Sequence, residues 1–180
     1  ASEHSTITSW GLENEVDAFR NMLKQYPSGF VACVSDSKDV YNACDKLWGD
    51  VLRDEVLARN GTLVIRPDSG DPVEVNSRII DILWNKFGGD YSRKHFRVLN
   101  SHVRIIQGDG IDINTIEDIL KMYKTKGFSA ENIAFGSGGG LLQKFGRDTN
   151  KFAIKCSYAE INGKPVNVYK DPVTAKGKVY

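Results

Sequence analysis

The sequence predicts an α/β fold, in which the strands of a parallel sheet alternate with helices that cover it. Three observations predict this class. Short apolar runs rich in β-branched residues each lead into a polar or glycine-rich turn, and a segment suited to a helix follows each turn. This unit recurs four times at intervals of roughly 30 to 40 residues. Because the strands are apolar throughout rather than alternating, we expect them to be buried in a parallel sheet.

The first unit begins with a helix over residues 15–26, whose apolar residues fall at helical spacing and which ends at the Pro-Ser-Gly of 27–29. A buried strand follows over 30–37. The next helix carries an apolar stripe over 40–52, and we expect Asn60-Gly61 to break it.

The second unit has a strand over 62–70, after which Asp71 is the expected N-cap of a helix with Pro72 at its first position. Glycines at 88 and 89 end that helix. A polar, basic connection over 90–101 then leads to the third strand.

The third strand covers 103–110, and Asp112 is the expected cap of the helix that follows and closes at Gly127. The fourth strand and its turn cover 131–140. Beyond these units, the pattern around Asn162-Gly163 predicts an antiparallel β-hairpin.

Composition excludes several classes of function. The 180 residues fit one domain, 1–180, and 41% apolar with 26% charged residues is typical of a globular protein. A net charge of +1 offers no electrostatic attraction for nucleic acid or an anionic membrane. No apolar run approaches the roughly 18 residues of a membrane span. The three cysteines form no C-x-x-C pair, so we expect them to be reduced and structural.

Residues that carry chemistry collect where each predicted strand ends. Ligands of parallel α/β folds bind at the carboxyl ends of the strands. If the four strands are neighbours, three carboxylates, one guanidinium and a glycine-rich loop converge on one rim. The sequence therefore predicts a site for a ligand with both hydroxyl groups and a phosphate. The four turns are Ser35-Asp36-Ser37, Arg66-Pro67-Asp68-Ser69-Gly70, Gln107-Gly108-Asp109-Gly110 and Gly136-Ser137-Gly138-Gly139-Gly140.

The glycine-rich turn 136–140 is the expected phosphate site, because glycines at a helix N-terminus let backbone N–H groups approach an anion. Arg147 is placed to bind the same anion through two hydrogen bonds. Asp68 and Asp109 suit sugar hydroxyls, or Mg²⁺ held directly or through water. The turn matches neither a Walker A motif nor G-x-G-x-x-G, and a tight strand–helix connection remains the alternative.

Six strings, in order from residue 1 to about 172, make the chain resemble the nicotinamide phosphoribosyltransferase family. They are EHST (3–6), SDS (35–37), IRPDSG (65–70), IQGDG (106–110), NIAFGSGGGLLQK (132–144) and KCSY (155–158). The resemblance implies transfer of the phosphoribosyl group from phosphoribosyl pyrophosphate to nicotinamide, which yields nicotinamide mononucleotide and pyrophosphate in NAD salvage.

The resemblance also implies an architecture and an assembly. The fold would be part of an irregular parallel α/β barrel of the type II phosphoribosyltransferase kind, in a cytoplasmic homodimer with its active sites at the subunit interface. Mg²⁺ would accompany phosphoribosyl pyrophosphate. Members of this family are much longer, so we expect this chain to be a fragment, a split subunit or a processed product.

By resemblance, His4 and Asp68 are the catalytic residues. His4 would lie near the pyrophosphate and be phosphorylated when ATP hydrolysis is coupled to the reaction. Arg66 would contact pyrophosphate and nicotinamide, and Asp68 would line the ribose. Asp36 falls in a position suited to the ribose or metal side of the site.

The remaining binding residues are implied in the same way. Gly108 and Asp109 would line the ribose, whereas Gly138, Gly139 and Arg147 would hold the 5′-phosphate of the nucleotide. The metal ligands are not specified.

Three alternatives remain open. One is a relative of the nicotinate phosphoribosyltransferases, which share the architecture; competition between the two bases in an assay separates this reading from the first. A second alternative is a non-catalytic module that binds phosphoribosyl ligands without turnover. An unrelated phosphosugar barrel enzyme lacks support, because no lysine ends a strand as a Schiff-base residue would.

Overall fold

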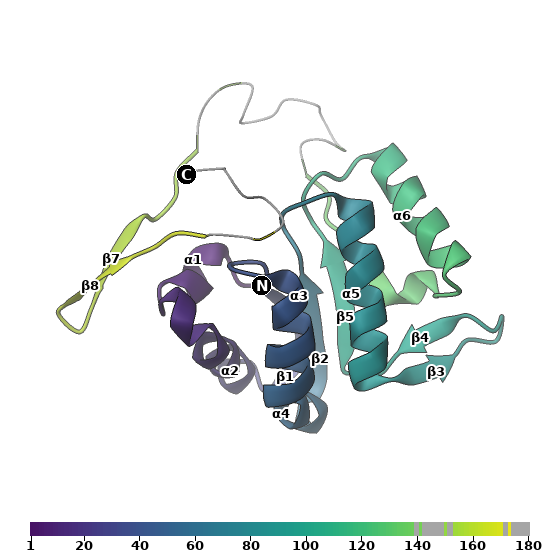
Figure 1. The fold of residues 1–180 in the computed structure, drawn as a ribbon, viewed down its shortest axis with the longest axis horizontal. Helices are drawn as coiled ribbons and strands as arrows, with labels where there is room; N and C mark the ends of the chain where they lie inside the picture. The colour runs from purple at the N-terminus through teal and green to yellow at the C-terminus, as the bar shows by residue number, and fades with distance from the viewer. Residues whose placement is uncertain (139–140, 142–149, 151–152, 171–172, 174–180) are drawn as a thin grey trace.

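The structure is a computed structural model, and it describes residues 1–138, 141, 150, 153–170 and 173. Its centre is a parallel sheet with the strand order β1 (Ser28–Val34), β2 (Asn60–Arg66), β5 (Val103–Gln107) and β6 (Ile133–Phe135). The predicted α/β class with a parallel sheet is therefore confirmed. Spatial neighbours follow chain order, and in the described part of the chain the sheet is open, with β1 and β6 at its edges (Figure 1).

Helices pack against this sheet and form the core with it. β5 is buried at Val103, Ile105 and Gln107 and half-buried at Arg104 and Ile106, so one of its faces is more open than the other. The helical elements are α1 (His4–Thr8), η1 (Leu12–Asn14), α2 (Glu15–Gln25), α3 (Val40–Asn42), η2 (Ala43–Val51), α4 (Arg53–Ala58), α5 (Pro72–Phe87), α6 (Ile113–Thr125) and η3 (Ala130–Asn132). None of the helices in the described residues is long and apolar enough to cross a membrane.

Both predicted helix caps are confirmed. The carboxylate of Asp71 accepts hydrogen bonds from the N–H groups of Val73 and Glu74 at 3.0 and 2.8 Å. Asp112 accepts one from the N–H of Thr115 at 2.9 Å. These side chains satisfy N–H groups that have no partner within the helix, so α5 and α6 begin where the local sequence predicts.

Three boundaries differ from the predictions. β1 ends at Val34, so residues 35–37 form a turn rather than the end of the strand. The predicted single helix over 40–52 is α3 followed by the π-helix η2. Asn60-Gly61 already belongs to β2, where Gly61 pairs with Gly29 so closely that there is no room for a side chain.

Two antiparallel pairs complete the fold. One of them, β3 (Gly89–Tyr91) with β4 (Arg97–Leu99), lies within the segment that sequence analysis treated as a plain connection. The other, β7 (Tyr158–Ile161) with β8 (Lys164–Asn167), is seen where the Asn-Gly signal predicts it. Asn162 and Gly163 both have positive φ, 52° and 75°, as a two-residue hairpin turn requires. This hairpin projects away from the sheet (Figure 1).

Candidate active site

The polar turns after the strands meet at one edge of the sheet. In the parallel register Val34 pairs with Arg66 and Gln107 with Phe135, so the carboxyl ends of neighbouring strands are level. The turns after β5 and β6 touch: the N–H of Gly136 donates to the Gln107 carbonyl oxygen at 2.7 Å. A methyl group on Gly136 would lie 2.9 Å from Cα of Gly108. Glycine at 136 therefore permits the close approach of the two turns.

His4 reaches this rim from the short helix α1. Its Nε2 lies 2.8 Å from Oδ1 of Asp36, and its Nδ1 lies 3.7 Å from Oδ2 of Asp68. Ser2 anchors the start of the chain to β1. Its N–H donates to the Ala32 carbonyl oxygen at 2.8 Å, and its hydroxyl accepts from the Val34 N–H at 2.9 Å. The two proposed catalytic residues, His4 and Asp68, are thus neighbours in the fold.

Asp36 is a buried carboxylate with both oxygens engaged. Its side chain has no exposed surface, and besides His4 it accepts hydrogen bonds from the Asp68 N–H at 3.1 Å and from the Ser69 hydroxyl. Burial alone would raise the pKa of Asp36, but the hydrogen bond and charge of His4, the bond from Ser69 and the charge of Lys170 hold it below its usual value. Asp36 lies behind His4, and its expected role beside ribose or metal stays a prediction.

Arg66 and Asp68 form a partly exposed ion pair beside His4. The Arg66 guanidinium lies 3.3 Å from Oδ1 of Asp68 and 3.4 Å from Oε1 of Glu3. Burial raises the pKa of Asp68, the charges of Arg66 and His4 oppose that rise, and the charges of Asp36 and Asp109 add to it. Such competition among neighbouring charges is typical of functional sites. Both groups remain about one-fifth exposed and accessible to a ligand.

The turn that carries Gly108 and Asp109 is held from below by an amide network. Asn76 of α5 donates to Oε1 of Gln107 at 2.7 Å, and Nε2 of Gln107 donates to the Asp109 carbonyl oxygen at 2.8 Å. Gln107 and Asn76 are buried, whereas Gly108 and Asp109 are exposed. A methyl group on Gly108 would contact Arg66 Nε at 3.7 Å, so this turn adjoins the ion pair.

The predicted phosphate cradle is only partly within the described residues. Gly138 is exposed and a methyl group there would meet nothing within 4 Å, which leaves open space above it. Gly139 and Arg147 lie outside the described residues. Their expected contact with the 5′-phosphate therefore stays a prediction.

Sequence analysis missed Lys170 and Asn76. Val173 donates its N–H to the Lys38 carbonyl oxygen at 2.8 Å, which brings the C-terminal segment back over the turn after β1 and puts the charge of Lys170 within reach of Asp36. Only this tertiary return places that lysine at the rim. Asn76, by contrast, could have been found from the sequence, because it lies among the apolar residues of an amphipathic helix, where a buried amide needs a hydrogen-bond partner.

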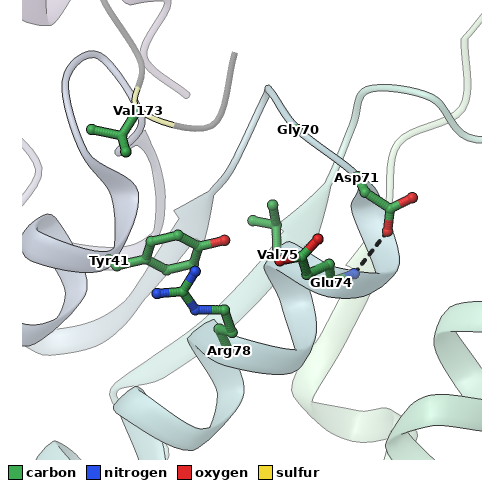
Figure 2. A pocket seen from close by; sticks show the side chains of 7 residues that line it. All are labelled: Tyr41, Gly70, Asp71, Glu74, Val75, Arg78 and Val173. Atoms are coloured by element: carbon green, nitrogen blue, oxygen red, sulfur yellow. Dashed lines mark hydrogen bonds between the residues drawn. The ribbon is translucent and has the colours of Figure 1, made fainter. Parts of the chain in front are cut away.

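A separate pocket of about 220 Å³ lies beside the rim, between α3 and the first turns of α5. Figure 2 shows the Arg78 guanidinium against the Tyr41 ring, 3.5 Å from its centroid, with Glu74 nearby and Val173 across the opening. The pocket does not include His4 or Asp68. In the part of the chain that the structure describes, no cluster of three or more His, Cys, Asp or Glu side chains is arranged to hold a metal ion.

Comparison with known proteins gives consistent matches over nearly the whole chain. Residues 1–179 match the model of the nicotinate phosphoribosyltransferase (NAPRTase) family. A protein named nicotinamide phosphoribosyltransferase from Xanthomonas campestris pv. campestris is 53% identical over 180 residues, which cover 99% of this chain and 38% of that protein.

Proteins with the same name from Acinetobacter baylyi and Mycoplasma pneumoniae are 34% and 35% identical. The matches cover 98% and 97% of this chain, and 39% and 41% of those proteins. The chain thus spans about two fifths of the length of the curated relatives it matches.

Proposed function

Because the chain belongs to the nicotinate phosphoribosyltransferase family, we propose that it carries a site for transfer of the phosphoribosyl group from phosphoribosyl pyrophosphate to nicotinamide. The products are nicotinamide mononucleotide and pyrophosphate. The observation that carries this proposal is the meeting of His4, Arg66 and Asp68 at the carboxyl edge of a parallel sheet. The names of the relatives favour nicotinamide over nicotinate as the base.

The chemistry of this transfer suits the charges at the rim. The ring nitrogen of nicotinamide attacks the anomeric carbon while the bond to pyrophosphate breaks, so positive charge develops on the ribose and negative charge on the leaving group. A carboxylate such as that of Asp68 stabilises the positive charge on the ribose, and the Arg66 guanidinium stabilises the negative charge on the leaving pyrophosphate. No covalent nucleophile is required for the transfer, because catalysis rests on position and electrostatics.

His4 is the proposed acceptor of a phosphoryl group from ATP. Its Nε2 is engaged with the buried Asp36 carboxylate, which accepts the N–H and so selects the tautomer with a lone pair on Nδ1. Nδ1 attacks the terminal phosphorus of ATP, the bond from that phosphorus to the bridging oxygen breaks, and its electron pair leaves with ADP. Asp36 stabilises the positive charge that develops on the ring.

The carboxylates of Asp68 and Asp109 at this rim would hold Mg²⁺. The ion is commonly held by one or two carboxylates together with the phosphates of its substrate. Asp109 is exposed, and Asp68 is close enough to it for the two charges to interact. When bound, the ion neutralises charge on the leaving pyrophosphate.

We also propose that the sheet is part of a barrel and that the whole enzyme forms a homodimer. Among the described residues, four parallel strands follow chain order with both sheet edges open, as a barrel portion requires, whereas a doubly wound sheet reverses its strand order. Residues 1–180 would then be one part of an irregular barrel that other segments of a longer enzyme complete. A homodimer in the cytoplasm is the expected assembly and location.

Titration calorimetry with nicotinamide mononucleotide and Mg²⁺ tests the site on the purified protein. Arg66→Ala should weaken binding by about tenfold or more, since a hydrogen bond to a charged group contributes roughly 1.5–3 kcal/mol. Arg20→Ala is the matched control, because this exposed arginine of α2 pairs with Asp17 of the same helix and with Glu55 of α4. Its binding should equal that of the wild type.

Binding that Arg66→Ala leaves unchanged would contradict the proposal. A folded 180-residue chain that binds no mononucleotide would mean that the site needs the rest of the enzyme, and a whole enzyme that also fails to bind would contradict the proposal. A turnover assay of the whole enzyme, with nicotinamide and nicotinate in competition, then identifies the base. Preference for nicotinate would favour the alternative reading within the family.

A further inference from the structure

The turn that carries Asp36 leads into the short helix α3, and α3 continues into a π-helix, η2, which ends before α4. Its defining hydrogen bond runs from the Leu52 N–H to the Leu47 carbonyl oxygen, five residues back, at 2.8 Å. π-Helices account for well under 1% of residues in globular proteins, and they occur frequently at functional sites. A nine-residue π-helix that begins six residues after the turn at 35–37 and follows α3 therefore calls for a physical explanation.

Specific residues hold this helix in place. Asp39 caps the start of α3 and accepts hydrogen bonds from the N–H groups of Tyr41 and Asn42 at 2.9 and 3.2 Å. Further along, Gly49 of η2 packs so closely against α5 that there is no room for a side chain. A methyl group there would lie 2.6 Å from Cγ of Lys86 and 2.7 Å from the Cys44 carbonyl oxygen. The continuous segment α3–η2 is thus held at the start of α3 and along the packed side of η2.

The wide turn places Trp48 beneath the active-site loop. Trp48 has no exposed surface, and its ring stacks on Phe19 of α2 with centroids 4.3 Å apart. Its indole Nε1–H donates to the Ser35 hydroxyl at 3.1 Å. Ser35 in turn donates its hydroxyl to the Cys33 carbonyl oxygen at 3.0 Å and its N–H to the Arg66 carbonyl oxygen at 3.1 Å.

Ser35 is therefore joined to β1, β2 and η2, one residue before Asp36. A buried indole needs some acceptor, and any carbonyl of the core would serve. In this fold the acceptor is the residue whose backbone sets the position of the carboxylate that holds His4. The bond thus connects the core to the candidate site.

We propose that η2 is a positioning element of the active site, and that Trp48 is a positioning residue which, through Ser35, holds the Asp36 carboxylate against His4. The catalytic consequence rests on the proposed function, because a displaced group costs rate only if His4 and Asp36 take part in the reaction. The placement of Asp36 does not rest on it. A test that observes His4 directly therefore separates the two.

The test compares Trp48→Phe with Phe19→Leu in the purified protein. The first removes the indole donor and keeps an aromatic ring in the core, whereas the second disturbs the same stack and keeps the donor. Nuclear magnetic resonance of the His4 Nε2–H proton reports its hydrogen bond to Asp36, and His95 and His102 provide internal references. We expect Trp48→Phe to speed exchange of this proton with water by about tenfold, and Phe19→Leu to leave it within about twofold of the wild type.

Ser35→Ala removes the acceptor with a small change of volume, and it decides the question if Trp48→Phe does not fold. Its exchange rate should rise to the level of Trp48→Phe, and the double variant should show no further rise, because both changes break the same bond. The inference is overturned if Ser35→Ala or folded Trp48→Phe retains wild-type exchange. It is equally overturned if Phe19→Leu speeds exchange as much as Trp48→Phe does. These outcomes are independent of whether the protein binds nicotinamide mononucleotide.

Discussion

Glu15, in the first turn of α2, is a buried carboxyl group whose replacement by glutamine should change how stability depends on pH. It is 5% exposed, and its Oε1 has no hydrogen-bond partner among the described residues. Burial raises its pKa to about 7 from 4.5; the charge of Lys38 opposes the rise, and the charges of Asp36 and Asp39 add to it. Between pH 4.5 and about 7 the folded protein therefore retains a proton on Glu15 that the unfolded chain releases.

The size of the effect follows from the difference between the two pKa values. Below pH 4.5 both states carry the proton, and the group does not distinguish them. As the pH rises toward 7 only the unfolded chain ionises freely, so the free energy of unfolding falls. With 1.36 kcal/mol for each pH unit, a change from 4.5 to about 7 corresponds to a loss of about 3 kcal/mol, complete above pH 7.

Urea unfolding followed by tryptophan fluorescence at pH 4.5, 6, 7 and 8 measures this loss. Glutamine has no proton to release at this position. The difference in free energy of unfolding between Glu15→Gln and the wild type should therefore grow by about 3 kcal/mol, in favour of the variant, from pH 4.5 to pH 8. Subtraction of the two curves removes the contributions of all other titrating groups. Glu13→Gln is the matched control, since Glu13 is exposed two residues earlier, and its curve should run parallel to the wild type.

The reasoning would be refuted if the wild type and Glu15→Gln differed by a constant amount, within about 0.5 kcal/mol, across this range. A constant difference would mean that Glu15 ionises equally easily in the folded and unfolded states. The carboxyl group would then have access to water or to a partner that the contacts do not show.

Two further predictions concern packing and thiol reactivity. Gly61→Ala should lower the free energy of unfolding by about 2 kcal/mol, because the new methyl group would overlap the backbone of Gly29 on the paired strand; thermal unfolding measures this, and a neutral result would contradict the close pairing. At pH 8 a thiol reagent should modify exposed Cys156 rapidly, whereas Cys33 and Cys44 should react only on unfolding. Burial raises the pKa of both inner thiols, that of Cys33 to about 12. Rapid modification of all three in the folded protein would argue against this core.

Local physical chemistry explains which parts of the fold the sequence predicts. Asp71 and Asp112 cap helices because their carboxylates reach N–H groups two or three residues ahead, and that reach depends only on nearby residues. The Asn162-Gly163 turn forms because both positions take positive φ. The polar turns after the strands were equally visible, since each follows an apolar run.

Other features have no local signal. The apolar stripe over 40–52 fits an α-helix as well as the observed π-helix, and packing of Gly49 against α5 accompanies the wider turn. The strands β3 and β4 are three residues each; β3 is exposed throughout, whereas β4 is half-buried and ends at the buried Leu99. Segments this short carry no apolar period that would mark them.

By itself, the sequence determined that four buried strands alternate with helices, where α5 and α6 are capped, and that a polar or glycine-rich turn follows each of those strands. These depend on spacing and on interactions within a few residues. Only the tertiary structure decided that Asp36 is buried behind His4, that Trp48 donates a hydrogen bond to Ser35, and that burial raises the pKa of Glu15. The physical reason is that burial and hydrogen bonding depend on which distant segments become neighbours. Here the register of β1 with β2 and the packing of α1, α2 and η2 bring those segments together.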